Sequence, residues 1–193
     1  MHWEELTGDQ FQQAVQAVQG VCLLPLSCIE RHGHHLPLGT DMFIGREMCK
    51  RAAALEPAIV FPDFIFTQIL EARHVPGTIA VEPELFLRLL DNVCREMARN
   101  GLHKIVIVNA HGGNDSLIHF FAQIQLASPR DYVVYVAEPF SAGKRRPSSR
   151  RSGRLRSMGT RLKARPARFW RFGLSCSTPT NCQSRGKVCR SNG

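Results

Sequence analysis

The sequence predicts an α/β fold with three layers, in which a mostly parallel central sheet lies between two layers of helices. Short apolar runs alternate along residues 1–140 with segments whose apolar residues recur at helical spacing, as in parallel strands joined by helices. Two loops rich in polar residues follow directly after apolar runs, and reactive side chains in such sheets gather where strands end. The alternation stops near residue 140, so we expect this fold to be incomplete at its C-terminal end.

The first part of the chain contains two predicted helices and two predicted strands. Thr7 can cap a helix that runs through about Gln19, and Gly20 ends it. The apolar run 21–29 is typical of a buried strand, although Pro25 disfavours a regular central position because it has no N–H. The elements that follow are a polar loop (30–41), a helix (42–55) and a strand (58–61).

The second part of the chain repeats the alternation. Pro83 suits the first turn of a helix that runs through about Asn100, and Gly101 ends it. The remaining predicted elements are a buried strand (104–109), a polar loop (110–115), a helix (116–126) and a strand (132–137). Strands and helices in this order form a sheet covered on both faces.

Charge divides the chain into two segments. The whole sequence has a net charge of +9, yet residues 141–193 hold 15 of the 25 basic residues and none of the 16 acidic ones. Residues 1–140 therefore have a net charge of −6. We expect a folded domain over 1–140 and an Arg-rich, disordered tail over 141–193. Such a tail is also compatible with a basic arm that binds nucleic acid through phosphate contacts.

The beginning of the chain and its cysteines indicate a cytoplasmic protein. Residues 1–5 are acidic and lack the basic and then apolar layout of a signal peptide. No apolar stretch approaches the roughly 20 residues that cross a bilayer. The chain has seven cysteines, and an odd number argues against a framework of disulfides. The cysteines within or beside apolar stretches of the sequence are expected to be buried free thiols; these are Cys22, Cys28, Cys49 and Cys94.

The loop after the first predicted strand concentrates groups that bind metals. Glu30, His32, His34, His35 and Asp41 lie within twelve residues, and imidazole and carboxylate are ligands of zinc, manganese and iron. In an extended segment, the side chains of residues two apart point the same way, so Glu30 and His32 can face one cavity. The loop can bring the Asp41 side chain back to the same cavity at the start of the next helix.

A second polar loop, over residues 109–114, places His111 at another strand end beside two glycines. Any one of these histidines or acids could equally be a solvated side chain, and Glu30 with Arg31 could form an exposed charged turn. The concentration of the group favours a site. His2, His103 and His119 have no such neighbours in sequence, and we expect no role for them.

Three motifs, in order, give the chain a specific resemblance. Residues 30–41 read Glu-Arg-His-Gly-His-His-Leu-Pro-Leu-Gly-Thr-Asp, residues 75–79 read Val-Pro-Gly-Thr-Ile, and residues 109–114 read Asn-Ala-His-Gly-Gly-Asn. These segments resemble the metal-binding loop, the Phe-Pro-Gly-Thr-Ile segment and the Asn-Gly-His-Gly-Gly-Asn loop of the creatininase (creatinine amidohydrolase) family. Departures from the family pattern include Arg31 for Gln and Ala110 for Gly.

The resemblance implies a creatininase-like fold and a hydrolase of C–N bonds in linear or cyclic amides. It implies two divalent ions per subunit (zinc, manganese or iron), with Glu30 and His111 on one ion, His32 on the other and Asp41 bridging both. Such a pair supplies a hydroxide nucleophile at neutral pH. His35 and Asn114 are then candidate contacts to the ligands or the substrate, which would be a small-molecule or peptide amide. The family also implies a homo-oligomer.

One family motif, His-Ala-x-Glu-x-Glu-Thr-Ser, is missing, and with it the remaining carboxylate ligand. No acidic residue follows Phe140. When the frame is shifted back by one base, the codons from Gly159 onward permit Gly-His-Ala-x-Glu-Ser/Gly-Glu-Thr-Ser. We therefore hypothesise that residues from about Ser141 are an out-of-frame translation and that the chain is impaired as an enzyme.

Two other functions are compatible with parts of the sequence. A non-catalytic relic would keep partial metal binding without amide hydrolysis. A serine esterase could use the His-Gly-Gly segment at 111–113 as an oxyanion loop, but the chain contains no Gly-x-Ser-x-Gly.

Overall fold

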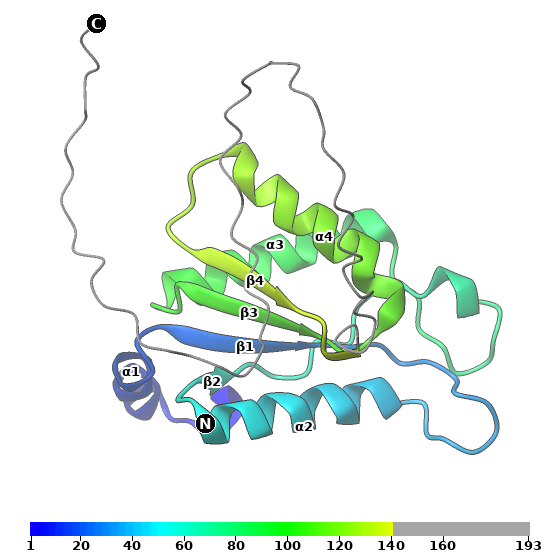
Figure 1. Ribbon diagram of the computed structural model, residues 1–193, viewed down its shortest axis with the longest axis horizontal. Helices are drawn as coiled ribbons and strands as arrows, with labels where there is room; N and C mark the ends of the chain where they lie inside the picture. The colour runs from blue at the N-terminus through cyan, green and yellow to red at the C-terminus, as the bar shows by residue number, and fades with distance from the viewer. Residues whose placement is uncertain (141–193) are drawn as a thin grey trace, which may run out of the picture.

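The structure is a computed structural model in which residues 1–140 are described, so the predictions for the tail over 141–193 lie outside the described residues. Its centre is a four-stranded sheet in the order β2-β1-β3-β4, and every pair of neighbouring strands is parallel (Figure 1). The strands are β1 (Val21–Leu26), β2 (Ile59–Val60), β3 (Lys104–Asn109) and β4 (Val133–Ala137). The predicted α/β fold with a parallel sheet is confirmed.

The helices lie on both sides of the sheet, as Figure 1 shows for α2 on one face and for α3 and α4 on the other. Within residues 1–140 the α-helices are α1 (Gly8–Ala17), α2 (Thr40–Leu55), α3 (Pro83–Arg99) and α4 (Asp115–Ile124). Short 3-10 helices span Trp3–Glu5, Leu70–Ala72 (η2), Gly112–Asn114 (η3) and Gln125–Ala127. This is the three-layer arrangement that the sequence predicts.

Two apolar clusters fill the space between the layers. The larger lies between the sheet and α1, α3 and α4, with Leu24, Phe86 and Phe121 fully buried in it. The smaller joins the opposite face of the sheet to α2 through residues such as Leu23 and Cys49. Alternate residues of β1 thus enter different clusters, because successive side chains of a strand point to opposite faces.

Local signals set several boundaries of these elements. Thr7 caps α1 in a capping box, in which its hydroxyl accepts from the Gln10 N–H at 3.4 Å and the Gln10 side chain accepts from the Thr7 N–H at 2.9 Å. Pro83 begins α3 as predicted. The strand predicted at 21–29 ends earlier, at Leu26, where the chain turns toward the polar loop.

The prediction that Pro25 disfavours a central position is wrong. β1 lies between β2 and β3, and Pro25 pairs in register with Val108. The backbone groups of Leu23 and Pro25 face the β2 side, where their carbonyls accept from the Phe61 and Phe64 N–H groups. β2 pairs with β1 only as far as Leu23, so the N–H that proline lacks falls beyond the end of this short neighbour.

The connections create a switch point between β1 and β3. From β1 the chain passes through α2 to β2 on one side, whereas from β3 it passes through α4 to β4 on the other. Leu26 and Asn109 pair at the carboxyl ends of the two central strands. The loops that follow them therefore leave the sheet side by side, at the position where ligands bind in open α/β sheets.

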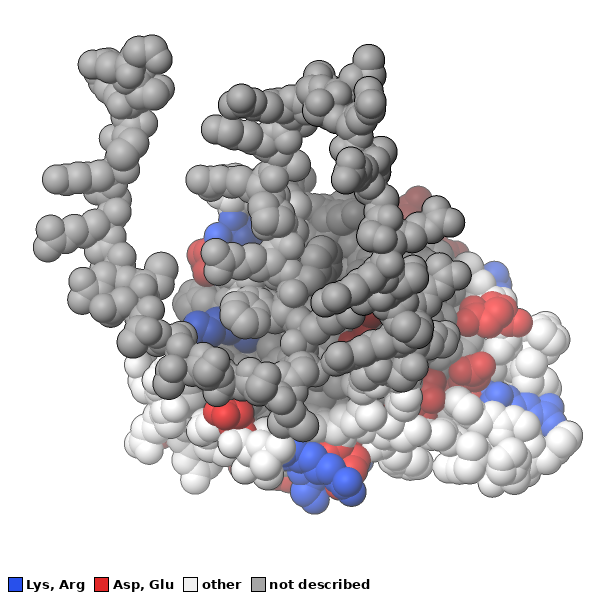
Figure 2. Space-filling model, viewed as in Figure 1, with Lys and Arg blue, Asp and Glu red and all other residues white. Residues whose placement is uncertain are grey.

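The described surface carries mixed charge. Figure 2 shows Asp and Glu side chains interspersed with Lys and Arg on the visible white surface of residues 1–140. The four predicted buried cysteines, Cys22, Cys28, Cys49 and Cys94, are buried free thiols. Among residues 1–140, no helix is both long and apolar enough to span a membrane.

Candidate metal centre

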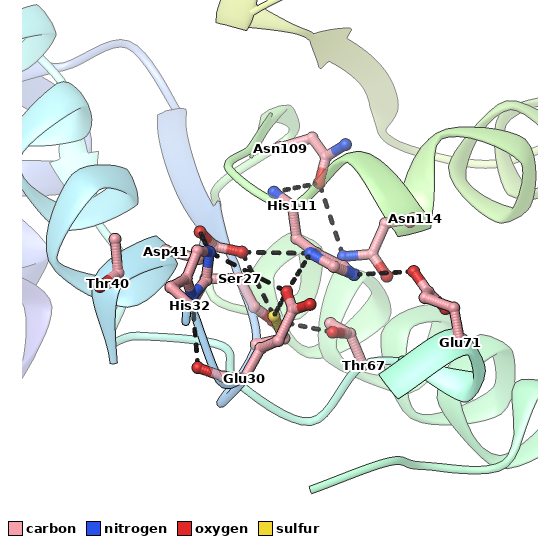
Figure 3. A network of polar contacts seen from close by, with 12 residues as sticks. Ser27, Glu30, His32, Thr40, Asp41, Thr67, Glu71, Asn109, His111 and Asn114 are labelled. Atoms are coloured by element: carbon pink, nitrogen blue, oxygen red, sulfur yellow. Dashed lines mark hydrogen bonds and ion pairs between the residues drawn. The ribbon is translucent and has the colours of Figure 1, made fainter. Parts of the chain in front are cut away.

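Asp41 lies at the centre of a cluster of polar side chains at the switch point (Figure 3). It belongs to the first turn of α2 and is buried. Its Oδ1 lies 3.1 Å from His32 Nε2, and its Oδ2 lies 3.1 Å from His111 Nδ1. One carboxylate thus contacts both polar loops. Its negative charge near a helix N-terminus is also favourable.

Glu30 completes the contact between the loops. Its Oε2 lies 3.5 Å from His111 Nδ1 and 4.0 Å from His32 Nε2. The Glu30 N–H donates to the Leu38 carbonyl at 3.0 Å, which folds the first loop back on itself. The structure therefore brings together the four residues predicted as metal ligands, Glu30, His32, Asp41 and His111.

Asn109 and Asn114 support the loop that carries His111. The Asn109 side-chain oxygen accepts from the His111 backbone N–H at 3.2 Å and lies 3.5 Å from Asn114 Nδ2. The Asn109 amide in turn donates to Asp115 at 2.7 Å. Asn114 is fully buried behind the loop and reaches the cluster through Asn109, rather than by contacting Glu30 or Asp41.

Gln68 and Glu71 approach His111 from the segment around η2. Glu71 Oε1 lies 3.7 Å from His111 Nε2, and the Gln68 side chain donates to the Gly113 carbonyl. A methyl group added at Gly113 would overlap Glu71 and the His111 ring. A side chain at this position would displace the Glu71 carboxylate or the His111 ring, so close packing favours glycine here.

Cys28 is a further member of the cluster. Its Sγ lies 3.3 Å from Asp41 Oδ2 and 3.9 Å from Glu30 Oε2. Cys28, Gln68 and Glu71 were not predicted as site residues. The sequence signal for Cys28 was its position two residues before Glu30, and that for Glu71 was its position close to the motif at residues 75–79. Gln68 had no such signal. Neither signal shows where a side chain points.

The remaining histidines of the first loop lie elsewhere. His35 is exposed and has no hydrogen bond or ion pair with Glu30, His32, Asp41 or His111 among the described residues. His34 is also exposed, with its ring 2.9 Å from the Arg31 guanidinium. The structure thus brings His32 to Asp41, but not His34 or His35.

The cluster shifts the pKa values of its members. Burial alone would raise the pKa of Asp41, but hydrogen bonds from His111 and Cys28 outweigh burial, so this pKa is lowered. Burial alone would lower the pKa of His111, but the hydrogen bond and charge of Asp41 together with the charges of Glu30 and Glu71 outweigh burial, so this pKa is raised above its ordinary 6.5. Burial, followed by the charge of Asp41, raises the pKa of the Cys28 thiol.

These shifts predict how the metal-free protein responds to pH. The raised pKa of His111 contributes stability that is present below pH 6.5 and is lost as pH rises through the folded-state pKa. The lowered pKa of Asp41 contributes stability that is present above pH 3.8 and is lost only in acid.

We expect the Tm advantage of the metal-free chain over Asp41→Asn to be larger at about pH 5.5 than at about pH 8.5. An advantage that is equal or larger at the higher pH would contradict this coupling.

The donor set has the composition of a metal site. Ligand atoms from Cys28, Glu30, Asp41 and His111 all lie within 4.8 Å of one another, and His32 lies next to Asp41. Nitrogen, oxygen and sulfur donors in one buried group suit a divalent transition metal. Two loops and the start of a helix thus bring different kinds of potential ligand to one point in the fold.

A sequence model described as "Creatininase: Creatinine amidohydrolase" matches residues 4–158. The chain belongs to the creatininase family. The resemblance drawn from the three motifs is thereby confirmed. The match also includes 18 residues beyond residue 140, the predicted end of the folded domain.

Several relatives have established names. The creatinine amidohydrolase of Pseudomonas putida is 29% identical over 119 residues, covering 59% of this chain and 46% of the relative. The 3-dehydro-scyllo-inosose hydrolase of Thermotoga maritima is 26% identical over 64% of this chain and 41% of the relative. The mycofactocin precursor peptide peptidase of Mycolicibacterium smegmatis is 30% identical over 55% of this chain and 45% of the relative. The chain spans less than half the length of these relatives.

Solved structures of creatininases share the fold. One described as "Creatininase Mn" superimposes with a TM-score of 0.63 and 26% identity, covering 71% of this chain and 57% of that one. A mutant creatininase described as "Zn-Zn type" gives a TM-score of 0.65 with 26% identity, covering 74% of this chain and 59% of that one. These matches confirm the creatininase-like fold for the described part of the chain.

Proposed function

We propose that this chain is a metal-dependent hydrolase of C–N bonds in linear or cyclic amides, in which Glu30, His32, Asp41 and His111 hold two divalent ions. The observation that carries the proposal is the position of Asp41. Its two carboxylate oxygens face different partners, Oδ1 toward His32 and Oδ2 toward His111, each at 3.1 Å.

This arrangement supports a bridging role for Asp41. A carboxylate between two cations offsets their mutual repulsion, which is why an anionic side chain is needed there. Glu30 Oε2 lies nearer His111 Nδ1 than His32 Nε2, at 3.5 Å against 4.0 Å. We therefore assign Glu30 and His111 to one ion and His32 to the other. The names of the solved creatininases, which mention Mn in one case and Zn in another, support both metals as candidates.

When bound, two such ions lower the pKa of a water molecule and polarise an amide carbonyl. The residues of this chain prepare the site for them. The Glu71 carboxylate lies on the Nε2 side of His111. With an ion bound, it would favour the tautomer whose proton is on Nε2, so that Nδ1, which contacts Asp41 in the metal-free protein, would be free to bind the ion. Asn109 fixes the backbone of the same loop through its contact with the His111 N–H.

The substrate enters from the side of the first loop. Asp41 and His111 are buried, whereas Glu30 and His32 are half-buried and His35 is exposed on the same loop. We propose His35 as a substrate contact and Asn114 as a support of the His111 loop. The named relatives include hydrolases of creatinine and of a precursor peptide, so both small cyclic amides and peptide amides are candidate substrates.

We also propose that the chain is impaired relative to family members that carry the His-Ala-x-Glu-x-Glu-Thr-Ser motif. Residues 141–193 contain no Asp or Glu, so the carboxylate ligand that the family takes from this motif has no counterpart among them. An out-of-frame translation from about Ser141 accounts for this, since a frame shifted by one base permits the missing motif from Gly159 onward. The same observation favours a second candidate function, a relic that keeps partial metal binding without turnover.

Metal content and turnover measured on one sample test the proposal. The full chain is stripped with a chelator, reloaded with Zn²⁺ or Mn²⁺, freed of excess metal, and then analysed for bound metal and for hydrolysis of creatinine and of a peptide amide. Both candidate functions predict that the chain binds metal. Two bound ions together with turnover would support the hydrolase. One ion without turnover supports the relic. A folded chain that binds no metal would overturn both functions.

A further inference from the structure

Cys28 differs from the other buried cysteines in its surroundings. Cys22 and Cys94 belong to the larger apolar cluster and Cys49 to the smaller one, as expected of inert thiols. Cys28 is equally buried, with no exposed surface, yet it belongs to neither cluster. It follows β1 by two residues, and its sulfur faces polar groups instead of aliphatic side chains.

The polar groups that surround the sulfur are the proposed metal ligands. Cys28 Sγ lies 3.3 Å from Asp41 Oδ2 and 3.9 Å from Glu30 Oε2, and these atoms lie within 4.8 Å of a His111 ring nitrogen. In the metal-free protein the thiol can donate to a carboxylate. A cation among these atoms would have the sulfur as a near neighbour, because its distances to the oxygens are similar to those between the oxygens and nitrogens of the set.

We propose that Cys28 is a ligand of the ion held by Glu30 and His111, and that it binds as a thiolate. This inference rests on the proposed metal-dependent function. When the sulfur–metal bond forms, the S–H bond breaks, the sulfur donates the electron pair to the ion, and the proton leaves to solvent. Cys28 thereby supplies a negatively charged donor to a site that receives no carboxylate from residues 141–193.

A thiolate ligand changes which metal the site prefers. Sulfur donors favour zinc and other soft or borderline ions, whereas sites built from carboxylate and water suit manganese. With Cys28 as a ligand, the ion beside Glu30 should be Zn²⁺ rather than Mn²⁺ when both are offered. Cys28→Ser keeps the size of the side chain and replaces the soft donor with a hard one, so it should shift this preference toward Mn²⁺.

Cobalt is a suitable probe because a thiolate bound to Co²⁺ gives a charge-transfer absorption in the near ultraviolet. The metal-free full chain is titrated with Co²⁺, and both bound cobalt and this absorption are measured for the unchanged chain, Cys28→Ser and Cys49→Ser. Cys49 is the matched control, since it is equally buried but lies in the apolar cluster under α2. We expect the band in the unchanged chain and in Cys49→Ser, and its loss in Cys28→Ser.

A competition between Zn²⁺ and Mn²⁺ gives a second readout. Cys28→Ser should reduce the ratio of zinc affinity to manganese affinity by at least about tenfold. Tenfold is the lower end of the loss in metal affinity caused by mutating a residue that only supports a metal ligand. If Cys28→Ser does not fold, X-ray absorption is measured on the zinc-loaded chain in which the three cysteines of residues 141–193, Cys176, Cys182 and Cys189, are changed to serine so that they cannot bind zinc. The spectrum should still show one sulfur atom bound to zinc.

The outcomes separate this inference from the proposed function. Cobalt that binds without a thiolate band, or with a band that Cys28→Ser leaves unchanged, overturns the role of Cys28 and leaves the metal-dependent hydrolase standing. Absence of a sulfur neighbour around bound zinc does the same. A folded chain that binds neither cobalt nor zinc overturns both.

Discussion

Asp41→Asn should abolish binding of both metal ions and lower amide hydrolysis by at least about 100-fold, the upper end of the losses caused by residues that only support metal ligands. The amide has nearly the size of the carboxylate, but it lacks the negative charge that offsets repulsion between two cations. Because Oδ1 faces His32 and Oδ2 faces His111, one substitution affects the ligands of both ions. Bound metal and turnover of the purified full chain, measured side by side, test this expectation.

The metal-free variant should still fold. Asp41→Asn removes a charge from the first turn of α2, worth about 0.3–1 kcal/mol, and weakens the hydrogen bonds of His111 and Cys28. We expect a loss of roughly 1–3 kcal/mol in the free energy of unfolding. Glu47→Gln is the matched control, because Glu47 lies on the same helix but is exposed and paired with Arg51. Retention of two ions by Asp41→Asn would refute the bridging role.

The sequence predicted those parts of the fold that depend on local chemistry. The capping box of Thr7 and Gln10 fixes the start of α1, and Pro83 fixes the start of α3. The continuous apolar run of β3 likewise marks a strand covered on both faces. The effect of Pro25 could not be predicted in this way, because the cost of a proline in a strand depends here on the length of the neighbouring strand β2, which is a property of the assembled sheet.

The same distinction explains how much of the site was predictable. Glu30 and His32 lie on the loop after β1, Asp41 lies in the first turn of the helix that follows this loop, and His111 lies two residues after β3. The prediction that strand ends lie together was therefore enough to place them in one cluster. Glu71 reaches His111 from η2, a segment 40 residues earlier in the chain. Cys28 lies close to Glu30 in sequence, but its role depends on whether it points into an apolar cluster or toward Asp41. Side-chain direction in an irregular segment has no sequence period from which it can be predicted.

The end of the family match adds to the question of the missing ligand. The match ends at residue 158, one residue before the segment in which the shifted frame permits the family motif. It includes residues 141–158 in the present frame, which does not support a change of frame as early as Ser141. The described part of the chain contains the proposed ligands, which lie after β1 and β3 and at the start of α2. The proposal of an impaired enzyme therefore concerns one remaining carboxylate and the segment that would deliver it.

Restoring the reading frame beyond about Ser141 should raise amide hydrolysis by at least about 100-fold and tighten the more weakly bound ion by at least about tenfold, as expected for return of a ligand. The added carboxylate would complete the coordination of one of the two proposed ions. The measurement compares turnover and metal affinity of the restored chain with those of the present one, after the gene itself has been read.

A restored chain in which the acidic residues of the recovered motif are changed to Gln is the matched control, because it keeps the restored length and composition. It should fold as the restored chain does, yet bind metal and hydrolyse amides no better than the present chain. If this control is as active as the restored chain, the gain comes from completing the fold and not from a ligand. A gene that carries the motif in none of its frames would refute the frame hypothesis itself, while leaving the cluster around Asp41 and its metal-binding test unaffected.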